Sequence, residues 1–495
     1  MSRVQKLAVI DIGSNSVRLG IFDVENRSYI PLFSEKALCG LGKGFSKKGE
    51  LNPSAKEAVM MQLHRFVKVI QHVSVDSVKA VATAAMREAV DGKEFAAEIE
   101  RDTGFKVRIL KEKEEAYYSA LGVRSGLHSV KGIVADLGGV SLEMIYLDPD
   151  EIDFINSILA GGLKCQDIDE AGEDLDDYLK KIFKVLEDEP RLKEKGDLYL
   201  VGGGFRTIGK AYIDHIKYEP RNVHHFSAPR SEMKDFVKRV IRQHENGYRR
   251  DDFELEYPSI SGKRAALLPY YCKALLSLLH HCKAECVLFS SYGLKEGIFF
   301  ETLSETEQKK DPLFLCCDML AKSQARFQQV PDYMAWLSDI IALIPQRYSR
   351  LLTASAKLID LAWMDHSEAR GKIAFWRIAY LSLPGASHHE RLFIAMILFV
   401  RYTGDFNKFE HKEFLKEFNK EELFVILLFG RALRLVSSLS IGDASLLDEV
   451  DLSWDEKNET LTLRTKAFEH AKIEALYGES VQKRFKSLQK TLIEG

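Results

Sequence analysis

Short apolar segments separated by polar turns run along the first half of the chain, and the first two of them flank one such turn. Residues 7–10 are continuously apolar, and residues 17–22 alternate between apolar positions and positions that are small or charged. Patterns of this length are typical of buried and half-buried strands. Residues 11–16, Asp-Ile-Gly-Ser-Asn-Ser, lie between the two segments. The pattern therefore predicts a strand, a tight polar turn and a second strand.

The polar turn has the residue types that bind an anion. Gly13 permits backbone conformations closed to other residues, so successive N–H groups can point at one anion. Ser14, Asn15 and Ser16 add short hydrogen-bonding side chains, and Asp11 can hold a metal ion or a water next to that anion. An ordinary polar hairpin explains the turn alone equally well.

A second copy of this pattern favours the anion-binding interpretation. Residues 133–146 are again an apolar segment, an Asp-Gly turn and an apolar segment. In kind, the first turn's Asp11, Gly13, Ser14 and Ser16 are matched by Asp136, Gly138, Gly139 and Ser141. The two copies, about 125 residues apart, indicate two similar α/β lobes that supply phosphate-binding turns to one cleft. This arrangement resembles the actin-like ATPase superfamily.

Length and composition bound the class of protein. A chain of 495 residues is too long for one hydrophobic core, so three or four domains are expected. The 46% hydrophobic and 29% charged residues are typical of a soluble globular protein. A net charge of −3 gives no overall attraction to nucleic acid or to anionic membranes, so we expect neither as a partner. A polyanion site must then be a local basic patch.

Three further features predict a cytoplasmic protein. The first residues lead directly into the first predicted strand, so no signal peptide is expected. No apolar run approaches the roughly 20 residues of a membrane span, and Leu423 to Phe429 is far too short. Seven cysteines form an odd number without the spacing of a disulfide framework, which indicates reduced thiols.

Alternating strand and helix patterns continue to about residue 306. A helix over residues 52–73 should be capped by Asn52, with Pro53 in its first turn. The glycine-rich, basic residues 38–48 predict a loop or a lid. Further strands are predicted at residues 78–82, 107–110, 198–201 and 287–290, and further helices begin near residues 83, 111, 202 and 261.

The pattern becomes almost entirely helical after residue 311. Helices are predicted over residues 351–363, 373–381, 390–401 and 421–435, followed by a hairpin within 446–464 and a last helix over 469–492. The predicted domains are two lobes at 1–128 and 129–306, a helical domain at 307–435 and a small α+β domain at 436–495.

Six motifs, taken together and in this order, resemble the exopolyphosphatase / guanosine-pentaphosphate phosphatase (Ppx/GppA) family. They lie at residues 10–19, 82–87, 114–116, 136–143, 201–206 and 290–297. The resemblance is strong over residues 5–305 and looser in the helical region. It implies an α/β fold of two actin-like (ribonuclease H-like) ATPase lobes flanking a cleft, then an all-α HD-like domain and a small α+β domain.

The same resemblance implies the activity. We expect an exopolyphosphatase that hydrolyses terminal phosphates from inorganic polyphosphate with Mg²⁺, and a homodimer. A guanosine-pentaphosphate phosphatase needs the same site, and the sequence does not separate the two. A non-catalytic sensor of polyphosphate or guanosine tetraphosphate is a third possibility. A sugar kinase of the same superfamily is disfavoured by the Glu-Glu-Ala motif at residues 114–116.

The resemblance also assigns site residues. Glu115 corresponds to the catalytic glutamate that activates the attacking water. Asp11, Asp136 and Glu143 would bind Mg²⁺ or orient its waters. The phosphate-binding residues would be Gly13, Ser14, Asn15, Ser16, Arg18, Thr83, Arg87, Gly138, Gly139, Ser141, Arg206 and Arg264.

Two positions depart from the family pattern. Val140 stands where a third phosphate-loop glycine is expected, and a valine at positive φ would be a strained outlier. Either the loop takes another path or Val140 has negative φ and only crowds the anion. The helical domain lacks a His-Asp pair, since residues 358–361 read Leu-Ile-Asp-Leu. Asp360 and His366 alone are poor metal ligands, so this domain is expected to be structural, dimer-forming or substrate-channelling.

Overall fold

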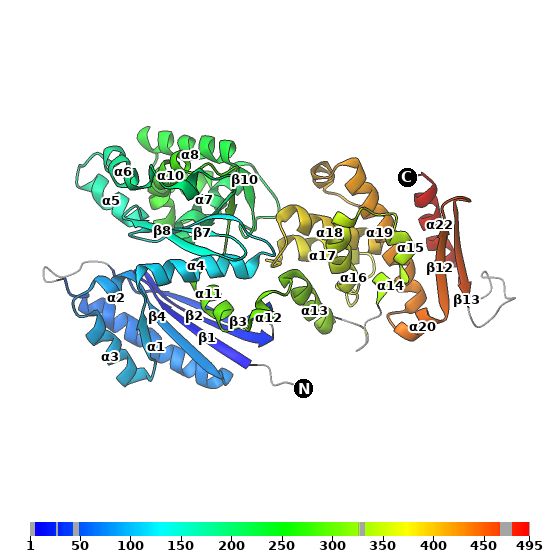
Figure 1. Cartoon of the computed structure of the whole chain (residues 1–495), viewed down its shortest axis with the longest axis horizontal. Helices are drawn as coiled ribbons and strands as arrows, with labels where there is room; N and C mark the ends of the chain where they lie inside the picture. Colours follow the sequence, from blue (N-terminus) through cyan, green and yellow to red (C-terminus); the bar gives the residue numbers. More distant parts are fainter. Residues whose placement is uncertain are drawn as a thin grey trace. The chain divides into compact units, whose positions relative to one another are not determined.

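The computed structural model describes residues 5–25, 28–42, 49–324, 326, 332–465 and 478–494. It divides into two compact units, Met1–Pro312 and Leu313–Gly495, and each is described separately below (Figure 1). The predicted loop at residues 38–48 lies outside the described residues from residue 43 onward.

The first sheet of the first unit contains the first predicted hairpin. Its strands are β1 (Gln5–Ile12), β2 (Ser16–Glu25), β3 (Ser28–Leu38), β4 (Ser77–Ala82) and β5 (Val107–Ile109), in the order β3-β2-β1-β4-β5. β1 pairs antiparallel with β2 and parallel with β4. The helices that follow in this part are α1 (Pro53–Val73), α2 (Ala84–Glu88) and α3 (Gly92–Thr103). The Asn52 side chain accepts from the Ser54 amide, which confirms the predicted cap of α1.

The second sheet contains the second predicted hairpin. Its strands are β6 (Gly132–Leu137), β7 (Leu142–Leu147), β8 (Ile152–Ile158), β9 (Asp197–Val201), β10 (Ser227–Pro229) and β11 (Cys286–Phe289), in the order β10-β11-β9-β6-β7-β8. One face packs in a core with α5 (Gly162–Glu170), α6 (Leu175–Phe183), α7 (Gly202–His215), α8 (Arg230–Glu245), α9 (Arg250–Glu256) and α10 (Lys263–His281). β6 pairs antiparallel with β7 and parallel with β9, so the two sheets share one local topology.

Two helices each pack on the sheet of the other lobe, which is not the sheet that they follow in sequence. α4 (Glu112–Gly126) follows the first sheet in sequence, yet its Ala116, Ala120 and Val123 pack on β6, β7 and β9 of the second. α11 (Leu294–Glu301) follows the second sheet, yet its Ile298 and neighbours pack on β1 and β4 of the first. The two helices lie in close contact, and Figure 1 shows α4 running between the lobes. α12 (Glu305–Gln308) follows α11.

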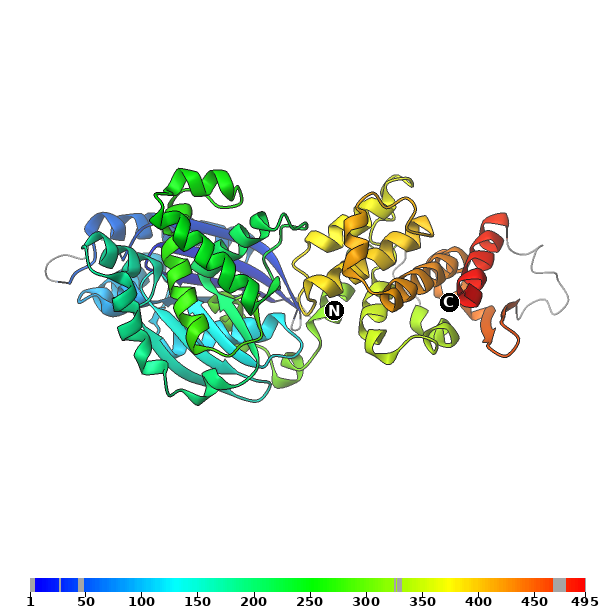
Figure 2. The same cartoon turned by 90° about the horizontal axis from the view of Figure 1, so that it is seen from above.

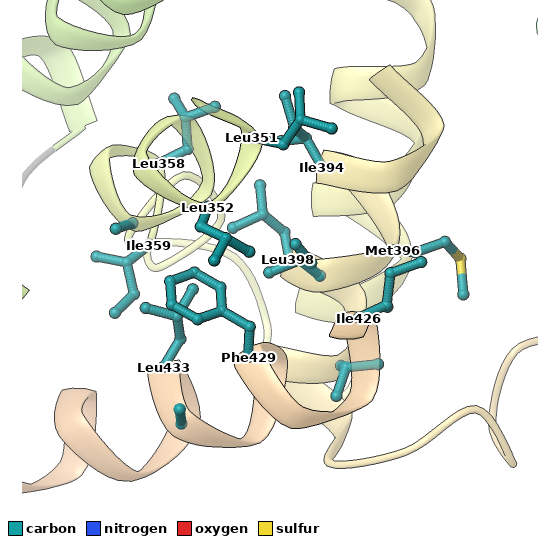
Figure 3. Packing of buried hydrophobic residues seen from close by; sticks show 14 of the residues in the cluster. Leu351, Leu352, Leu358, Ile359, Ile394, Met396, Leu398, Ile426, Phe429 and Leu433 are labelled. Atoms are coloured by element: carbon teal, nitrogen blue, oxygen red, sulfur yellow. The ribbon is translucent and has the colours of Figure 1, made fainter. Parts of the chain in front are cut away.

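The second unit is helical, as the sequence predicts. Its helices are α13 (Pro312–Gln324), α14 (Tyr333–Trp336), α15 (Ser338–Ile341), α16 (Ser349–Lys357), α17 (Arg370–Tyr380), α18 (His388–Thr403), α19 (Lys420–Ser440), α20 (Ala444–Asp448) and α22 (Glu479–Glu494), with a hairpin of β12 (Val450–Asp455) and β13 (Thr460–Thr465). Leucine, isoleucine and phenylalanine side chains of α16, α18 and α19 interdigitate in its core (Figure 3).

Three sequence expectations differ from this unit. The helix expected over residues 351–363 ends at Lys357. The Tyr402 hydroxyl donates to the Ile359 carbonyl and accepts from the Ala362 amide, so it pairs backbone groups of the turns that follow. The boundary expected between residues 435 and 436 lies inside α19, because the hairpin and α22 share one core with the helices. The last helix begins at Glu479, and residues 469–477 lie outside the described residues.

α19 is also longer and more apolar than the short run noted in the sequence. By length and composition alone it is the one helix among the described residues that could cross a membrane. About 67% of its apolar window is buried in the second unit, where it packs against α18 and α22 (Figure 2). The buried core helix of a globular domain passes the same test, so the composition of α19 follows from its central position in this core.

Candidate active site

The two predicted turns close with the same hydrogen bond. The Gly13 amide donates to the Ser16 carbonyl at 3.0 Å, and the Gly138 amide donates to the Ser141 carbonyl at 3.0 Å. The expectation that Gly13 needs a conformation closed to other residues is wrong, because both glycines have φ outside the left-handed region. A Cβ at either would lie 3.3 Å from the carbonyl that closes the turn, so crowding is the reason for glycine here.

The strand register gives the two turns opposite charges. Asp11 on β1 pairs with Arg18 on β2, and the equivalent pair on β6 and β7 is Asp136 with Glu143. The next position across the first sheet is Lys36 on β3, which pairs with Arg18. Cross-strand partners lie on the same face of a sheet. The first turn is therefore flanked by cations and the second by a carboxylate.

A cavity of about 620 Å³ within the first unit brings most of the predicted residues together. The predicted residues that line it are Asp11, Gly13, Ser14, Asn15, Ser16, Arg18, Thr83, Glu115, Asp136, Gly138, Gly139, Ser141, Arg206 and Arg264. Arg87 and Glu143 are not among the lining residues. Residues from both sheets, α4, α7, α10 and α11 contribute, so the cavity depends on the packing of both lobes.

Six cations are among the residues that line the cavity. Arg18, Arg206 and Arg264 were predicted; Lys36, Lys263 and Lys295 were not. Burial, followed by the charge of Arg18, lowers the pKa of Arg206 to about 10. Partial desolvation, followed by the charges of Arg18, Arg264 and Arg206, lowers the pKa of Lys36 to about 8. Mutual repulsion among these groups is what a bound polyanion would relieve.

Carboxylates line the same cavity. Burial is the largest cause of a raised pKa for both Asp11 and Asp136. The Ser119 hydroxyl donates to Asp136, and Arg18 lies 3.9 Å from Asp11. The charge of Asp11 raises the pKa of Asp136 further. A bound cation would relieve the repulsion between these carboxylates, as a bound anion would relieve the repulsion among the cations.

Glu115 lies at the first turn of α4 with its carboxylate on the cavity. Burial raises its pKa to about 7, with Arg87 opposing the rise and Asp136 and Asp11 adding to it. Arg87 donates to Glu115 at 3.0 Å and to the Leu110 carbonyl at 3.1 Å. Neither Arg87 nor Leu110 is a lining residue. The structure places the Arg87 guanidinium against the carboxylate of Glu115, and its predicted phosphate contact stays a prediction.

Glu143 also lies behind the lining. Its side chain is buried and accepts from the Ser157 hydroxyl at 3.2 Å. Burial, then the charges of Glu115 and Asp136, raise its pKa to about 8. Among the described residues, no three His, Cys, Asp or Glu side chains are arranged to hold a metal ion by themselves. A metal here would therefore need ligands from substrate and water as well.

Val140 has φ outside the left-handed region, so the second of the two expected outcomes holds. Its carbonyl accepts from the Gly161 amide at 2.8 Å, and a Cβ on Gly161 would lie 2.3 Å from the Val140 carbonyl carbon. A glycine opposite Val140, and not at Val140 itself, gives the loop its room.

Two of the lining lysines that the sequence did not predict, Lys36 and Lys295, can be related to features of the sequence. Lys36 stands opposite Arg18 once the β2–β3 pairing is drawn. Lys295 lies inside the motif at residues 290–297 and reaches from α11 to within 3.5 Å of where a Cβ on Gly20 of β2 would lie. The register of a hairpin and the packing of α11 on the sheet of the other lobe were both needed to place them.

Fold and cavity together define the class: a two-lobed protein of the actin-like ATPase fold with phosphate-type turns facing a cationic cavity. Comparison with known families identifies the member of this class. Residues 20–306 match the Ppx/GppA phosphatase family, and residues 341–492 match the exopolyphosphatase C-terminal family. The first match covers more than half of the chain. The chain belongs to the Ppx/GppA phosphatases, a family of hydrolases that act on phosphoanhydrides.

Individual relatives carry different names. A guanosine-5'-triphosphate,3'-diphosphate pyrophosphatase of Aliivibrio fischeri is 20% identical over 92% of this chain and 90% of the relative. Exopolyphosphatase 1 of Mycobacterium leprae is 28% identical over 28% of this chain and 42% of the relative. The solved PPX-GPPA enzyme of Aquifex aeolicus has a TM-score of 0.51 and 23% identity over 60% of this chain and 99% of that chain. This last likeness shows the fold.

Proposed function

We propose that the protein is an exopolyphosphatase, which removes terminal phosphates from inorganic polyphosphate. The charge of the cavity lining carries the proposal. Six cations line it, namely Arg18, Lys36, Arg206, Lys263, Arg264 and Lys295. Tyr271 is the one aromatic side chain among the lining residues in the part of the chain that the structure describes. Such a lining suits a chain of phosphates better than a ligand that includes a purine ring.

The proposed chemistry is phosphoryl transfer to water. The water attacks the terminal phosphorus, the anhydride P–O bond breaks, and the shortened chain leaves with the bond's electron pair. Glu115, held by Arg87 at 3.0 Å, accepts the proton of the attacking water. The two Gly-Ser turns hold the terminal phosphate, and the cations neutralise the charge of the leaving chain.

Magnesium is part of the proposal. Mg²⁺ keeps several waters and is typically held by one or two carboxylates plus substrate phosphates. Asp11 and Asp136, whose carboxylates line the cavity and repel each other, fit that requirement and would hold the ion. When bound, the ion supplies positive charge beside the phosphate. Glu143 is buried behind the lining, and its pKa of about 8 keeps it largely protonated at pH 7, so it is not assigned to the ion.

Hydrolysis of guanosine pentaphosphate is the second candidate. It is favoured by the similarity to the Aliivibrio pyrophosphatase, which extends over 92% of this chain. The same turns and the same base would act on its 5'-phosphates, with the nucleoside placed at the distal end of the cavity.

The deciding experiment compares phosphate release from long-chain polyphosphate and from guanosine pentaphosphate, each with magnesium and with excess chelator. Glu115→Gln, purified in parallel, controls for contaminating phosphatases. We expect a higher kcat/KM for polyphosphate and no release in chelator. The reverse preference would select the second candidate. Binding of either compound without release from either would make the protein a sensor, and full activity in chelator would remove magnesium from the mechanism.

A further inference from the structure

A buried histidine is hydrogen-bonded to the backbone of a residue that lines the cavity. His224, in the connection between α7 and β10, has no exposed surface and is not a lining residue. Its Nδ1 accepts a hydrogen bond from the backbone N–H of Ser291 at 3.1 Å. A backbone N–H can only donate, so Nδ1 is unprotonated and a neutral ring carries its proton on Nε2.

Ser291, whose backbone N–H is bound by His224, also positions the guanidinium of Arg206. Ser291 lines the cavity, and its carbonyl accepts from the Arg206 guanidinium at 3.0 Å. Arg206 itself lines the cavity from α7. One residue, Ser291, therefore links the imidazole on one side to the guanidinium on the other. Four residues further along the chain, Lys295 also faces the cavity.

Packing fixes the imidazole firmly enough to act as a support. Its ring stacks on His225 with centroids 3.8 Å apart and lies 4.3 Å from the ring of Tyr292. His225 has φ of 59°, a left-handed conformation that strains a non-glycine residue. Its amide donates to the Phe289 carbonyl at 2.8 Å, which helps hold this strained turn against β11. Such strain persists where the surrounding structure over-determines it.

We propose that His224 is a positioning residue of the active site, which acts through the Ser291 backbone to fix the Arg206 guanidinium against the phosphate chain. The inference rests on the proposed phosphohydrolase function. The N–H that His224 holds and the carbonyl that holds Arg206 flank the same Cα, so loss of the acceptor at Nδ1 lets the Ser291 Cα shift and carry that carbonyl with it. The loss falls on binding of the phosphate chain, because His224 touches neither the water nor its base.

Substitutions at one position separate this role from simple packing. His224→Phe keeps an aromatic ring against Tyr292 and removes the acceptor. His224→Gln introduces a side-chain amide one bond further from the backbone than the Nδ1 position. This variant replaces His224→Phe in the test if the phenylalanine variant does not fold. His224→Asn places its amide oxygen where Nδ1 stands. His281→Phe, in the last turn of α10 and about 27 Å along that helix from Lys263, is the matched control.

The readouts are KM and kcat for phosphate release from polyphosphate, and polyphosphate binding by calorimetry. We expect KM to rise roughly tenfold in His224→Phe and His224→Gln, with kcat changed less. The calorimetric Kd for polyphosphate should rise by the same factor as KM. His224→Asn should stay within about twofold of the parent, like His281→Phe. In an Arg206→Ala background, His224→Phe should have no further effect, because the group it positions is gone.

The outcomes distinguish two failures. If the parent protein binds polyphosphate but releases no phosphate, the proposed function fails, and the calorimetric comparison still tests the positioning role. If the parent is active and folded His224→Phe matches it, the positioning role is wrong. An additive loss in the Arg206→Ala background would also overturn it, since His224 would then act by another route.

Discussion

At the scale of single residues, Glu115 is subject to opposed influences, of which burial is the largest. Burial between the lobes destabilises its carboxylate, and Arg87 at 3.0 Å stabilises it. Burial wins, so its pKa lies at about 7 and not at the ordinary 4.5. A base is most effective when its pKa lies near the working pH, because it is then both deprotonated and able to hold a proton. The site therefore tunes Glu115 for the role that the proposal gives it.

This shift predicts the pH dependence of catalysis. Below about pH 7 Glu115 of the free enzyme holds a proton and cannot accept another, so kcat/KM should fall roughly tenfold per pH unit. The same shift means that the folded state binds this proton more tightly than the unfolded state does. The contribution of Glu115 to the free energy of unfolding therefore falls as pH rises from 4.5 to about 7. A kcat/KM that stays level between about pH 5.5 and 7 would contradict the assignment.

Removing the carboxylate tests the same residue without changing pH. Glu115→Gln keeps the shape and the contact with Arg87 but cannot accept the proton. We expect kcat to fall roughly 100-fold or more, with little change in polyphosphate affinity. Single-turnover phosphate release and calorimetric binding measure the two effects separately. Near-normal turnover would place the base elsewhere.

Val140 allows a revised expectation. The sequence alone predicts that Val140→Gly raises kcat/KM, by up to about 1.5–3 kcal/mol, by restoring a phosphate-binding glycine. The structure removes the strain behind that argument, because Val140 has φ outside the left-handed region and its carbonyl pairs with Gly161. We now expect a change within about twofold, since glycine adds only backbone freedom here. Steady-state kinetics decide, and a gain of tenfold would restore the original interpretation.

At the scale of elements, the site depends on how α4 and α11 cross. α4 carries Glu115 and α11 carries Lys295, so their contact sets the distance between these two residues. Glycines make the contact close. A Cβ on Gly297 would lie 1.8 Å from the Tyr118 carbonyl oxygen, and one on Gly122 would lie 2.2 Å from that of Gly293. No other residue fits at these two positions without moving a helix.

Gly297→Ala should therefore damage both stability and activity. The methyl group must push α11 away from α4, which we expect to cost about 1–3 kcal/mol in the free energy of unfolding. It also separates Lys295 from Glu115, so kcat/KM should fall by roughly tenfold or more. Gly478→Ala, where a Cβ meets no atom within 4 Å, is the control. Denaturant unfolding and polyphosphate hydrolysis measure the two effects, and a Gly297→Ala protein equal to the control would show that the crossing tolerates movement.

The crossing also shows where sequence reasoning stops. The hairpins and most helices could be predicted, because apolar periodicity and caps such as Asn52 are local signals. The pattern shows that α4 has a buried face but not which sheet covers it, and that choice decides which residues face the cavity. The sequence predicts Arg87 as a phosphate ligand, and it does not show that α4 brings Glu115 to within 3.0 Å of the Arg87 guanidinium. Lys36 was missed because its neighbour Arg18 is set by strand register, which is not local in sequence.

At the scale of the whole molecule, all the residues of the candidate site lie in the first unit. Every lining residue of the cavity belongs to residues 1–312, and that unit has its own hydrophobic cores. In the second unit, Asp360 is paired with Arg326 at 2.9 Å and lies 3.7 Å from Arg401. Two guanidiniums thus occupy the surroundings of the carboxylate that the sequence offered as a poor metal ligand. The second unit is therefore expected to bind substrate or a partner chain and not to catalyse.

A protein of residues 1–312 tests this division. It should fold with a cooperative thermal transition, because α11 and α12 remain and the cut follows the boundary of the unit. We expect it to hydrolyse short polyphosphates such as tripolyphosphate at a rate within about tenfold of the full chain, since the cavity is complete. We expect its preference for long chains to disappear, because the chain-binding role that we expect of the second unit is then absent. The measurement is the ratio of kcat/KM for long-chain polyphosphate to that for tripolyphosphate, in both proteins. An unchanged ratio would refute a chain-binding role, and a folded protein inactive on both substrates would show that residues beyond 312 take part in the chemistry.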